Sequence, residues 1–172
     1  MLTGTALRLL IVLLSTLPPL SIALASPLPA PTERVLLTLS GDIAHTNVGD
    51  EAQFDRGMLE ALSAHTIETH TPWHRDKGRY EGPLMRALLE TVGADDSEQV
   101  RIISLNHYEA VVPASDFRRH DVILAMTRDG EPLSIREYGP LFVLYPFDDH
   151  PELLTEAVRF RSVWHVERII VP

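Results

Sequence analysis

The segment from residue 65 to residue 94 constrains the fold of this chain more than any other. Residues 66–71 consist mainly of β-forming threonines alternating with polar residues, which predicts a strand with a polar face that Pro72 ends. Residues 74–79 lack apolar periodicity, which predicts a solvated loop. A helix is expected next, with Pro83 in its first turn, Gly93 as its C-terminal cap, and an apolar stripe of Leu84, Leu88, Leu89 and Val92. The segment therefore predicts a polar strand that leads to Trp73, then a loop and a core helix.

Apolar runs elsewhere predict several short strands with short helices between them. We expect strands at residues 34–40, 100–105, 122–126, 141–145 and 163–171, with residues 111–112 resuming the second of these. Asp50 is a suitable N-cap for a helix whose apolar stripe is Phe54, Met58, Ala61 and Leu62, and further helical turns are expected near residues 115–117 and 151–158. Asp129-Gly130 predicts a tight turn. This order indicates an α+β single domain with a mixed, barrel-like β-sheet core rather than a doubly wound sheet.

The N-terminal residues have the pattern of an export signal. Arg8 precedes the short apolar run Leu9–Leu14, and Ala23-Leu24-Ala25 forms a cleavage site, which predicts a signal peptide at residues 1–25. The run is too short to span a bilayer. A Pro-rich lead-in at residues 26–33 is expected before a single domain at residues 34–172, and export indicates a periplasmic location.

Composition excludes one class of partner and sets the source of stability. The formal net charge is -9 and the pI is about 5.3, so nucleic acid is not an expected partner. The sequence contains no cysteine, so an exported domain of this kind depends on its core rather than on disulfides.

Four sequence blocks, in one order, resemble the molybdopterin-binding domain of the sulfite oxidase superfamily. The first is a T-x-T-x-W pattern ending at Trp73 and followed by Tyr80, Gly82, Leu88, Leu89, Gly93 and Ala94. The second is residues 105–108, similar to the family's N-D-Y segment with His107 in place of aspartate. The third is residues 139–148, similar to its G-P-x-x-x-x-Y-P block, and the fourth is the closing segment at residues 161–169. Together the resemblance covers about residues 33–172 and implies the fold and a pterin-shaped pocket.

The chain departs from that family at the metal ligand. The resemblance implies a molybdenum-ligating cysteine a few residues before Trp73, and this chain has none. Thr69 lies near the expected position, and a threonine hydroxyl does not replace a soft thiolate. The resemblance therefore favours binding of a pterin and argues against the molybdenum cofactor and its redox chemistry.

The matching blocks supply the groups that a flat heteroaromatic ring needs. Such a ring needs aromatic faces for stacking and fixed donors and acceptors at its edge. We expect stacking from Trp73, Tyr108, Tyr145 and Trp164. Hydrogen bonds to the edge are expected from Asn106 and Ser162, and charge-assisted ones from Arg161 and His107.

Other kinds of site have little support in the sequence. His70 and His74 are four residues apart, but Pro72 between them excludes the helix that would bring them together at a metal. Asp148-Asp149-His150 has no Gly-x-Ser-x-Gly segment to complete a nucleophilic site. Exposed histidines leave a pH-dependent role open.

The sequence thus predicts an exported, non-catalytic pterin-binding protein. Cysteine-free, stand-alone relatives of this kind imply a partner, the periplasmic part of a membrane diguanylate cyclase/phosphodiesterase or a sensor kinase, to which pterin occupancy is relayed. One alternative is a molybdopterin-dependent oxidoreductase, or a subunit of one, that lacks the usual cysteine ligand. Another is an interaction module whose pocket is filled by side chains.

Overall fold

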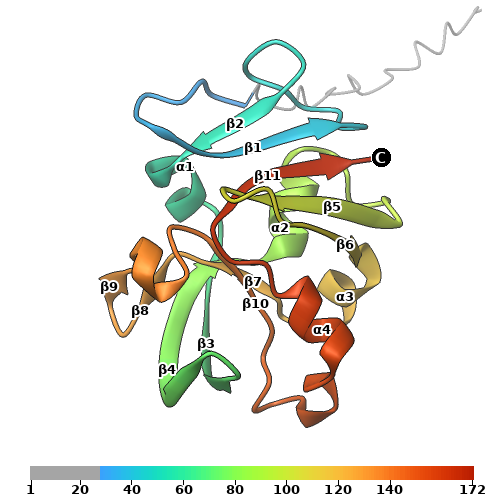
Figure 1. Ribbon diagram of the computed structural model, residues 1–172. Helices are drawn as coiled ribbons and strands as arrows, with labels where there is room; N and C mark the ends of the chain where they lie inside the picture. The colour runs from blue at the N-terminus through green and yellow to red at the C-terminus, as the bar shows by residue number, and fades with distance from the viewer. Residues whose placement is uncertain (1–27) are drawn as a thin grey trace, which may run out of the picture.

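The computed structural model describes residues 28–172, which form an α+β domain with three sheets and a few short helices (Figure 1). The predicted signal peptide lies outside the described residues. Among residues 28–172, none of the helices combines the length and the apolar character needed to cross a membrane. The α+β class and the short helices predicted from the sequence are confirmed.

A five-stranded sheet forms one side of the molecule, with strand order β2-β1-β11-β5-β6. Its central strands β1 and β11 run parallel, and every other pair is antiparallel. The strands are β1 (Val35–Gly41), β2 (Ala52–Asp55), β5 (Gln99–Ser104), β6 (Glu109–Pro113) and β11 (Val166–Val171). Leu37, Leu39 and Ile169 are fully buried, because alternate residues of the two central strands face the core.

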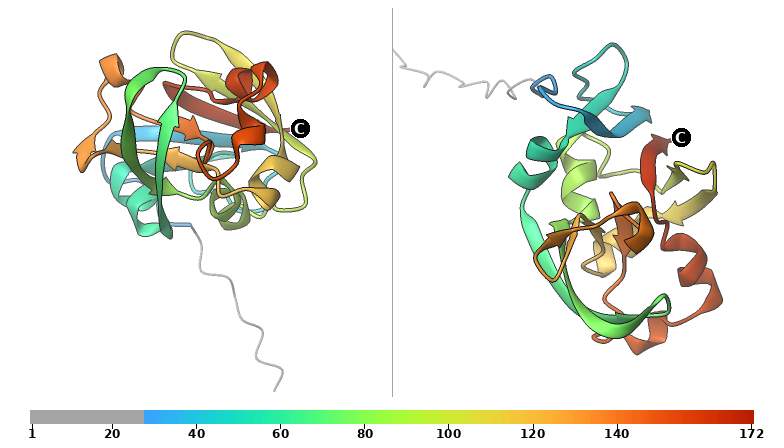
Figure 2. Two further views of the ribbon diagram at one scale, coloured as in Figure 1. Left: turned by 90° about the horizontal axis from the view of Figure 1, so that it is seen from below. Right: turned by 60° about the vertical axis from the view of Figure 1, so that its left-hand side comes forward.

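Two smaller sheets complete the β structure. A four-stranded sheet has the order β3-β4-β8-β9, and β10 pairs with β7 in a two-stranded sheet. The strands are β3 (Ala64–Thr71), β4 (His74–Pro83), β7 (Ile123–Ala125), β8 (Thr127–Arg128), β9 (Glu131–Pro132) and β10 (Phe142–Leu144). The long β3–β4 hairpin extends away from the five-stranded sheet and curves along one side of the molecule (Figures 1 and 2).

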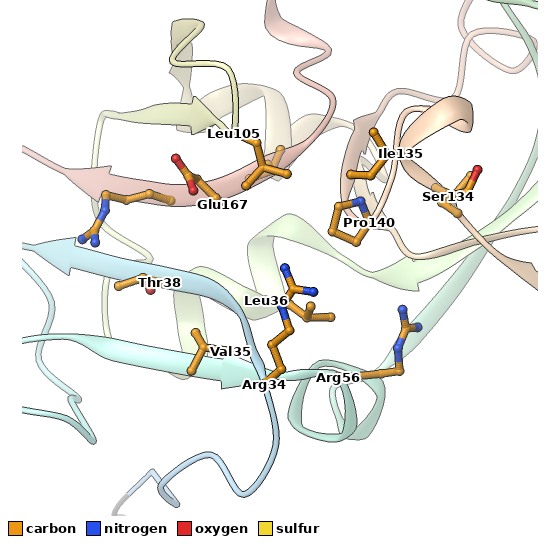
Figure 3. Close-up of a pocket in the computed structure, with 13 residues that line it drawn as sticks. Arg34, Val35, Leu36, Thr38, Arg56, Leu105, Ser134, Ile135, Pro140 and Glu167 are labelled. Carbon is orange, nitrogen blue, oxygen red and sulfur yellow. The ribbon is translucent and has the colours of Figure 1, made fainter.

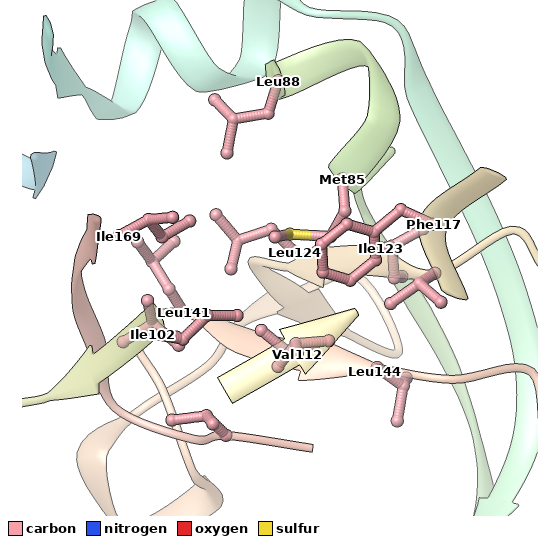
Figure 4. Close-up of a cluster of buried hydrophobic side chains, with 14 of the residues drawn as sticks. Met85, Leu88, Ile102, Val112, Phe117, Ile123, Leu124, Leu141, Leu144 and Ile169 are labelled. Carbon is pink, nitrogen blue, oxygen red and sulfur yellow. The ribbon is translucent and has the colours of Figure 1, made fainter. Parts of the chain in front are cut away.

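The helical segments are short and connect the strands. They are α1 (Arg56–Ala61), α2 (Met85–Thr91), α3 (Ala114–Arg119), α4 (Glu156–Arg161) and the two 3₁₀ turns η1 (Ile135–Glu137) and η2 (Pro151–Leu153). The core lies between α2, the five-stranded sheet and β7–β10, where Met85, Leu88, Ile102, Leu124 and Ile169 come together (Figure 4). Helices this short depend on such packing, because isolated helices of this length are marginal in water.

Three local predictions for residues 50–83 are wrong. Residues 74–79 are not a loop: they pair with β3 along a two-strand ladder, which stabilises a segment whose own sequence has little strand character. Asp50 is not a helix N-cap, because residues 52–55 pair with β1 and the helix begins only after Asp55. Pro83 ends β4 instead of entering α2. The Gly93 cap is confirmed by its left-handed φ of 68°.

Candidate functional site

The β5–β6 turn and the α4–β11 connection are brought together at one face of the domain. Asn106, His107 and Tyr108 form the turn, and the backbone N–H of His107 donates to Ser104 O over 2.8 Å. Residues 111–112 therefore belong to a second, antiparallel strand instead of resuming the first. The chain leaving α4 carries Ser162 and Trp164 to the start of β11, which pairs with β5. Because β5 and β11 are neighbours in the sheet, the sequence blocks at residues 105–108 and 161–169 lie side by side.

A cleft of about 190 Å³ lies between these two segments, and we call it the Tyr108–Trp164 cleft. Tyr108 joins the two segments: the Tyr108 hydroxyl donates to the carbonyl oxygen of Phe160 over 2.9 Å. Burial raises the pKa of the Tyr108 hydroxyl, so it stays a neutral donor at ordinary pH. The residues that line the cleft are Asn106, Tyr108, Arg159, Phe160, Ser162, Val163 and Trp164.

The polar groups of the cleft differ in how much hydrogen-bonding capacity remains. Asn106 Oδ1 accepts from the Ser104 hydroxyl and from the Tyr108 backbone N–H, which holds the turn. No partner for the Asn106 Nδ2 group is found among residues 28–172, so its donors are available to a ligand. Ser162 is buried and its hydroxyl donates to Val158 O over 2.9 Å, which leaves only its acceptor capacity.

Trp73 does not line this cleft but packs against Trp164, which does. It lies in the two-residue turn of the β3–β4 hairpin, with its ring centroid 5.6 Å from Trp164 and 5.4 Å from Phe142, both edge-on. Tyr138 also contacts Trp164, at 5.3 Å. Such edge-on aromatic contacts fix ring orientation. The space between the hairpin turn and β10 is therefore filled by aromatic side chains, while one side of Trp164 borders the cleft.

His74 holds the hairpin turn beside this aromatic cluster. Its Nδ1 atom lies 3.0 Å from both the Thr71 hydroxyl and the Tyr80 hydroxyl, and its ring meets the Tyr138 ring edge-on at 5.0 Å. Desolvation lowers the pKa of His74, so the ring is neutral at neutral pH. Within the described chain no group of histidine and acidic residues is arranged to hold a metal ion.

Besides Trp73, three predicted site residues lie apart from the cleft lining. Tyr145 is fully buried, and its hydroxyl donates to Asp116 over 2.9 Å. Arg161 donates to the same Asp116 oxygen over 3.0 Å, so its charge is compensated inside the domain. His107 is exposed at the tip of the turn with a left-handed φ of 64°. The structure thus brings together Asn106, Tyr108, Ser162 and Trp164, with Trp73 behind them.

Three cleft residues, Arg159, Phe160 and Val163, were missed by sequence reasoning. Arg159 and Phe160 lie two positions and one position before the family's block and gave no signal of their own. Val163 was expected only as the start of the last strand. The helix α4 continues through Arg161. Had the sequence predicted this, Arg159 and Phe160 would have been expected on its last turn, beside Ser162.

Thr69, which lies near the position expected for the metal ligand, has a structural role. Thr69 is fully buried; its hydroxyl donates to His70 O over 2.9 Å and accepts from the Asp148 backbone N–H over 3.0 Å. Its hydrogen bonds tie β3 to the segment after β10. Asp148 in turn pairs with His70 and Lys77, and the His70 backbone N–H helps to lower the pKa of its carboxyl.

Comparison with known proteins agrees with this architecture. Residues 56–147 match the family model described as the oxidoreductase molybdopterin binding domain, which is more than half of the chain. The chain therefore belongs to this family, and it is a member without cysteine.

A solved structure with a similar fold is the sulfane dehydrogenase SoxCD from Paracoccus pantotrophus, with 16% identity and a TM-score of 0.58. The match covers 78% of this chain and 37% of the SoxCD chain, so this chain spans well under half of that neighbour. At this identity the likeness shows the fold alone. No curated protein matches the sequence.

Proposed function

We propose that this chain is an exported, non-catalytic pterin-binding protein whose ligand occupies the Tyr108–Trp164 cleft. The observation that carries the proposal is that the rings of Tyr108 and Trp164 line one small cleft together with the Asn106 amide, whose donors have no partner within residues 28–172. Drug-sized ligands occupy about 300–1,000 Å³. A cleft of about 190 Å³ therefore favours a single small, flat ring system.

The donor set of the chain does not fit a molybdenum centre of the usual kind. The sequence has no cysteine, and the Thr69 hydroxyl already makes two hydrogen bonds inside the domain. A hard hydroxyl also lacks the softness of a thiolate ligand. These features support binding of a pterin ring without protein ligation of a metal.

A fluorescence titration with biopterin, an oxidised pterin that is itself fluorescent, tests the proposal. We expect saturable one-to-one binding and a loss of about tenfold or more in affinity for Trp164→Ala, since stacking on an aromatic side chain contributes about 1–3 kcal/mol. Tyr138→Phe is a matched control, because it keeps the aromatic cluster and lies outside the cleft. Absence of saturable binding of both oxidised and reduced biopterin at micromolar protein would refute the proposal.

The family itself favours a second candidate, a molybdopterin-dependent oxidoreductase or a subunit of one. Metal analysis of protein exported from its own host separates the two functions. Stoichiometric molybdenum in the purified protein would establish the second candidate, whereas its absence from protein that binds biopterin supports the first.

In our proposal the ligand-bound form is read by a membrane signalling partner, such as the periplasmic part of a diguanylate cyclase/phosphodiesterase or a sensor kinase. The support is that two residues lining the cleft, Tyr108 and Phe160, are 41% and 58% exposed, which makes the same side chains accessible to a ligand and to a partner. A partner that prefers the bound surface is then coupled to occupancy. Hydrogen exchange should show altered protection at the β5–β6 turn and α4 on biopterin binding; unchanged protection there would contradict a relay.

A further inference from the structure

A second and larger cavity lies where β1 and β11 begin, beneath the segment that leads into η1. Its volume is about 570 Å³, three times that of the Tyr108–Trp164 cleft, and the two share no lining residue. We call it the basic cavity. It is lined by Arg34, Val35, Leu36, Thr38, Arg56, Leu105, Leu133, Ser134, Ile135, Pro140, Val166, Glu167 and Arg168.

Two of its three arginines have little or no charge compensation. Arg34 makes no ion pair or side-chain hydrogen bond within residues 28–172, and residues 1–27 contain no acidic residue. Within the same described residues, Arg56 pairs only with Glu60, at 3.4 Å between solvent-accessible side chains, and pairs of this kind contribute little to stability. Arg168, by contrast, is paired with Glu51 at 2.7 Å.

The directions of these side chains define a cationic end of the cavity. The Arg34 and Arg56 side chains extend from the β1–α1 side toward the wall that carries Ser134 and Pro140 (Figure 3). Glu167 lies toward the other end, with its carboxylate directed away from both guanidinium groups (Figure 3). An anionic group between Arg34 and Arg56 would therefore lie away from the Glu167 carboxylate. The carboxylates close to this end are that of Glu60, which is paired with Arg56, and that of Glu137, which accepts a hydrogen bond from Ser134 over 3.3 Å.

The remaining lining is largely apolar. Leu36 and Val166 form the floor, and Ile135 and Leu105 remain 57% and 44% exposed at the rim. These apolar side chains are therefore left open beside Arg34, which has no partner within residues 28–172, and Arg56, which has only its pair with Glu60. Occupation by an apolar group would remove this surface from water, and an anion would compensate the two arginines.

From this arrangement we infer that the basic cavity binds a small organic anion with an apolar body. The acidic group, a carboxylate, sulfonate or phosphate, lies between Arg34 and Arg56 and accepts their N–H donors. The apolar body lies on Leu36, Val166 and Ile135. The volume is within the range of sites for small molecules. This site is distinct from the Tyr108–Trp164 cleft, and the inference does not depend on pterin binding there.

Titration with 8-anilinonaphthalene-1-sulfonate tests the inference, with neutral 1-anilinonaphthalene as the comparison probe. We expect Arg34→Glu/Arg56→Glu to weaken binding of the sulfonate at least tenfold and to leave the neutral probe within twofold. Arg75→Glu/Arg119→Glu is the matched control, because it makes the same change of net charge at exposed arginines outside the cavity. The control should leave sulfonate binding within twofold of the unaltered protein.

Two outcomes would overturn the inference. One is equal weakening by the two double variants, which would assign the effect to overall charge. The other outcome is that Trp164→Ala abolishes sulfonate binding whereas Arg34→Glu/Arg56→Glu does not affect it. This would place the probe in the Tyr108–Trp164 cleft. Arg34→Lys/Arg56→Lys guards against misfolding: it should fold normally, keep the charge and bind the sulfonate more tightly than the glutamate pair. Failure of biopterin to bind would leave this result unchanged, so the two proposals fail separately.

Discussion

Asp116 accepts hydrogen bonds from two side chains that the sequence assigned to ligand binding, Tyr145 and Arg161. Burial raises the pKa of the Tyr145 hydroxyl far above its ordinary value, so it remains a donor throughout the accessible pH range. Tyr145→Phe should lower the free energy of unfolding by about 1 kcal/mol in urea denaturation. Its biopterin affinity should not change.

Asp116→Ala should cost more, about 2 kcal/mol, because it leaves both donors without a partner. The loss stays below that of a fully buried ion pair, since the Arg161 side chain is 31% exposed. If Tyr145→Phe instead had normal stability and weakened biopterin binding, this prediction would be contradicted and Tyr145 would be a ligand-binding residue.

Only part of the candidate site could be predicted from the sequence. The family resemblance was enough to expect Asn106, Tyr108, Ser162 and Trp164 near one another, because these residues lie in the matching blocks at the ends of predicted strands. The sequence could not show that Tyr145 faces inward to Asp116, which lies 29 positions away. Nor could the sequence show that Trp73 packs edge-on against Trp164, because this contact depends on how the β3–β4 hairpin folds back over β10.

The start of α1 shows how strand pairing displaces a local helix signal. Asp55, not Asp50, accepts the backbone N–H of Met58 over 2.9 Å, and its other oxygen accepts from Thr32 and Glu33. These N–H groups, that of Met58 foremost, lower the pKa of the Asp55 carboxyl below 3.8. Its contribution to stability is therefore complete above pH 3.8 and is lost as the pH falls through the lowered pKa.

We expect Asp55→Ala to lower the midpoint of thermal unfolding at pH 7 and to reduce the further loss of stability between about pH 4 and pH 2. Asp50→Ala is the matched control and should do neither, because Asp50 caps no helix. Thermal scans at both pH values measure the two effects. Equal effects of the two variants would contradict the assigned cap.

The β3–β4 hairpin depends on a close approach that only glycine permits. A Cβ atom on Gly82 would overlap the carbonyl group of Leu124 on β7, whereas one on Gly57 in α1 would make ordinary contact at 3.6 Å. Gly82→Ala should therefore destabilise the domain by about 2–4 kcal/mol, and Gly57→Ala should stabilise it by about 0.5–1 kcal/mol through helix propensity. Urea denaturation measures both, and a neutral Gly82→Ala would show that β4 and β7 are further apart.

For the whole molecule, the β5–β6 turn connects the two proposed sites. Leu105 lines the basic cavity and the adjacent Asn106 lines the Tyr108–Trp164 cleft, while Leu105 N–H donates to His165 O over 2.9 Å beside Trp164. A ligand that shifts the turn at one site must therefore alter the walls of the other. Two ligands coupled in this way change each other's affinity by the same factor.

We expect saturating biopterin to change the dissociation constant of 8-anilinonaphthalene-1-sulfonate about fivefold or more, which corresponds to a coupling free energy of about 1 kcal/mol. The sulfonate should change the biopterin constant by an equal factor. Trp164→Ala, measured without biopterin, should leave the sulfonate constant unaltered, because Trp164 does not line the basic cavity. Independent binding, with each constant unaffected by the other ligand, would mean that the turn is rigid. Occupancy of the cleft would then have to reach a partner through direct contact with Tyr108 and Phe160.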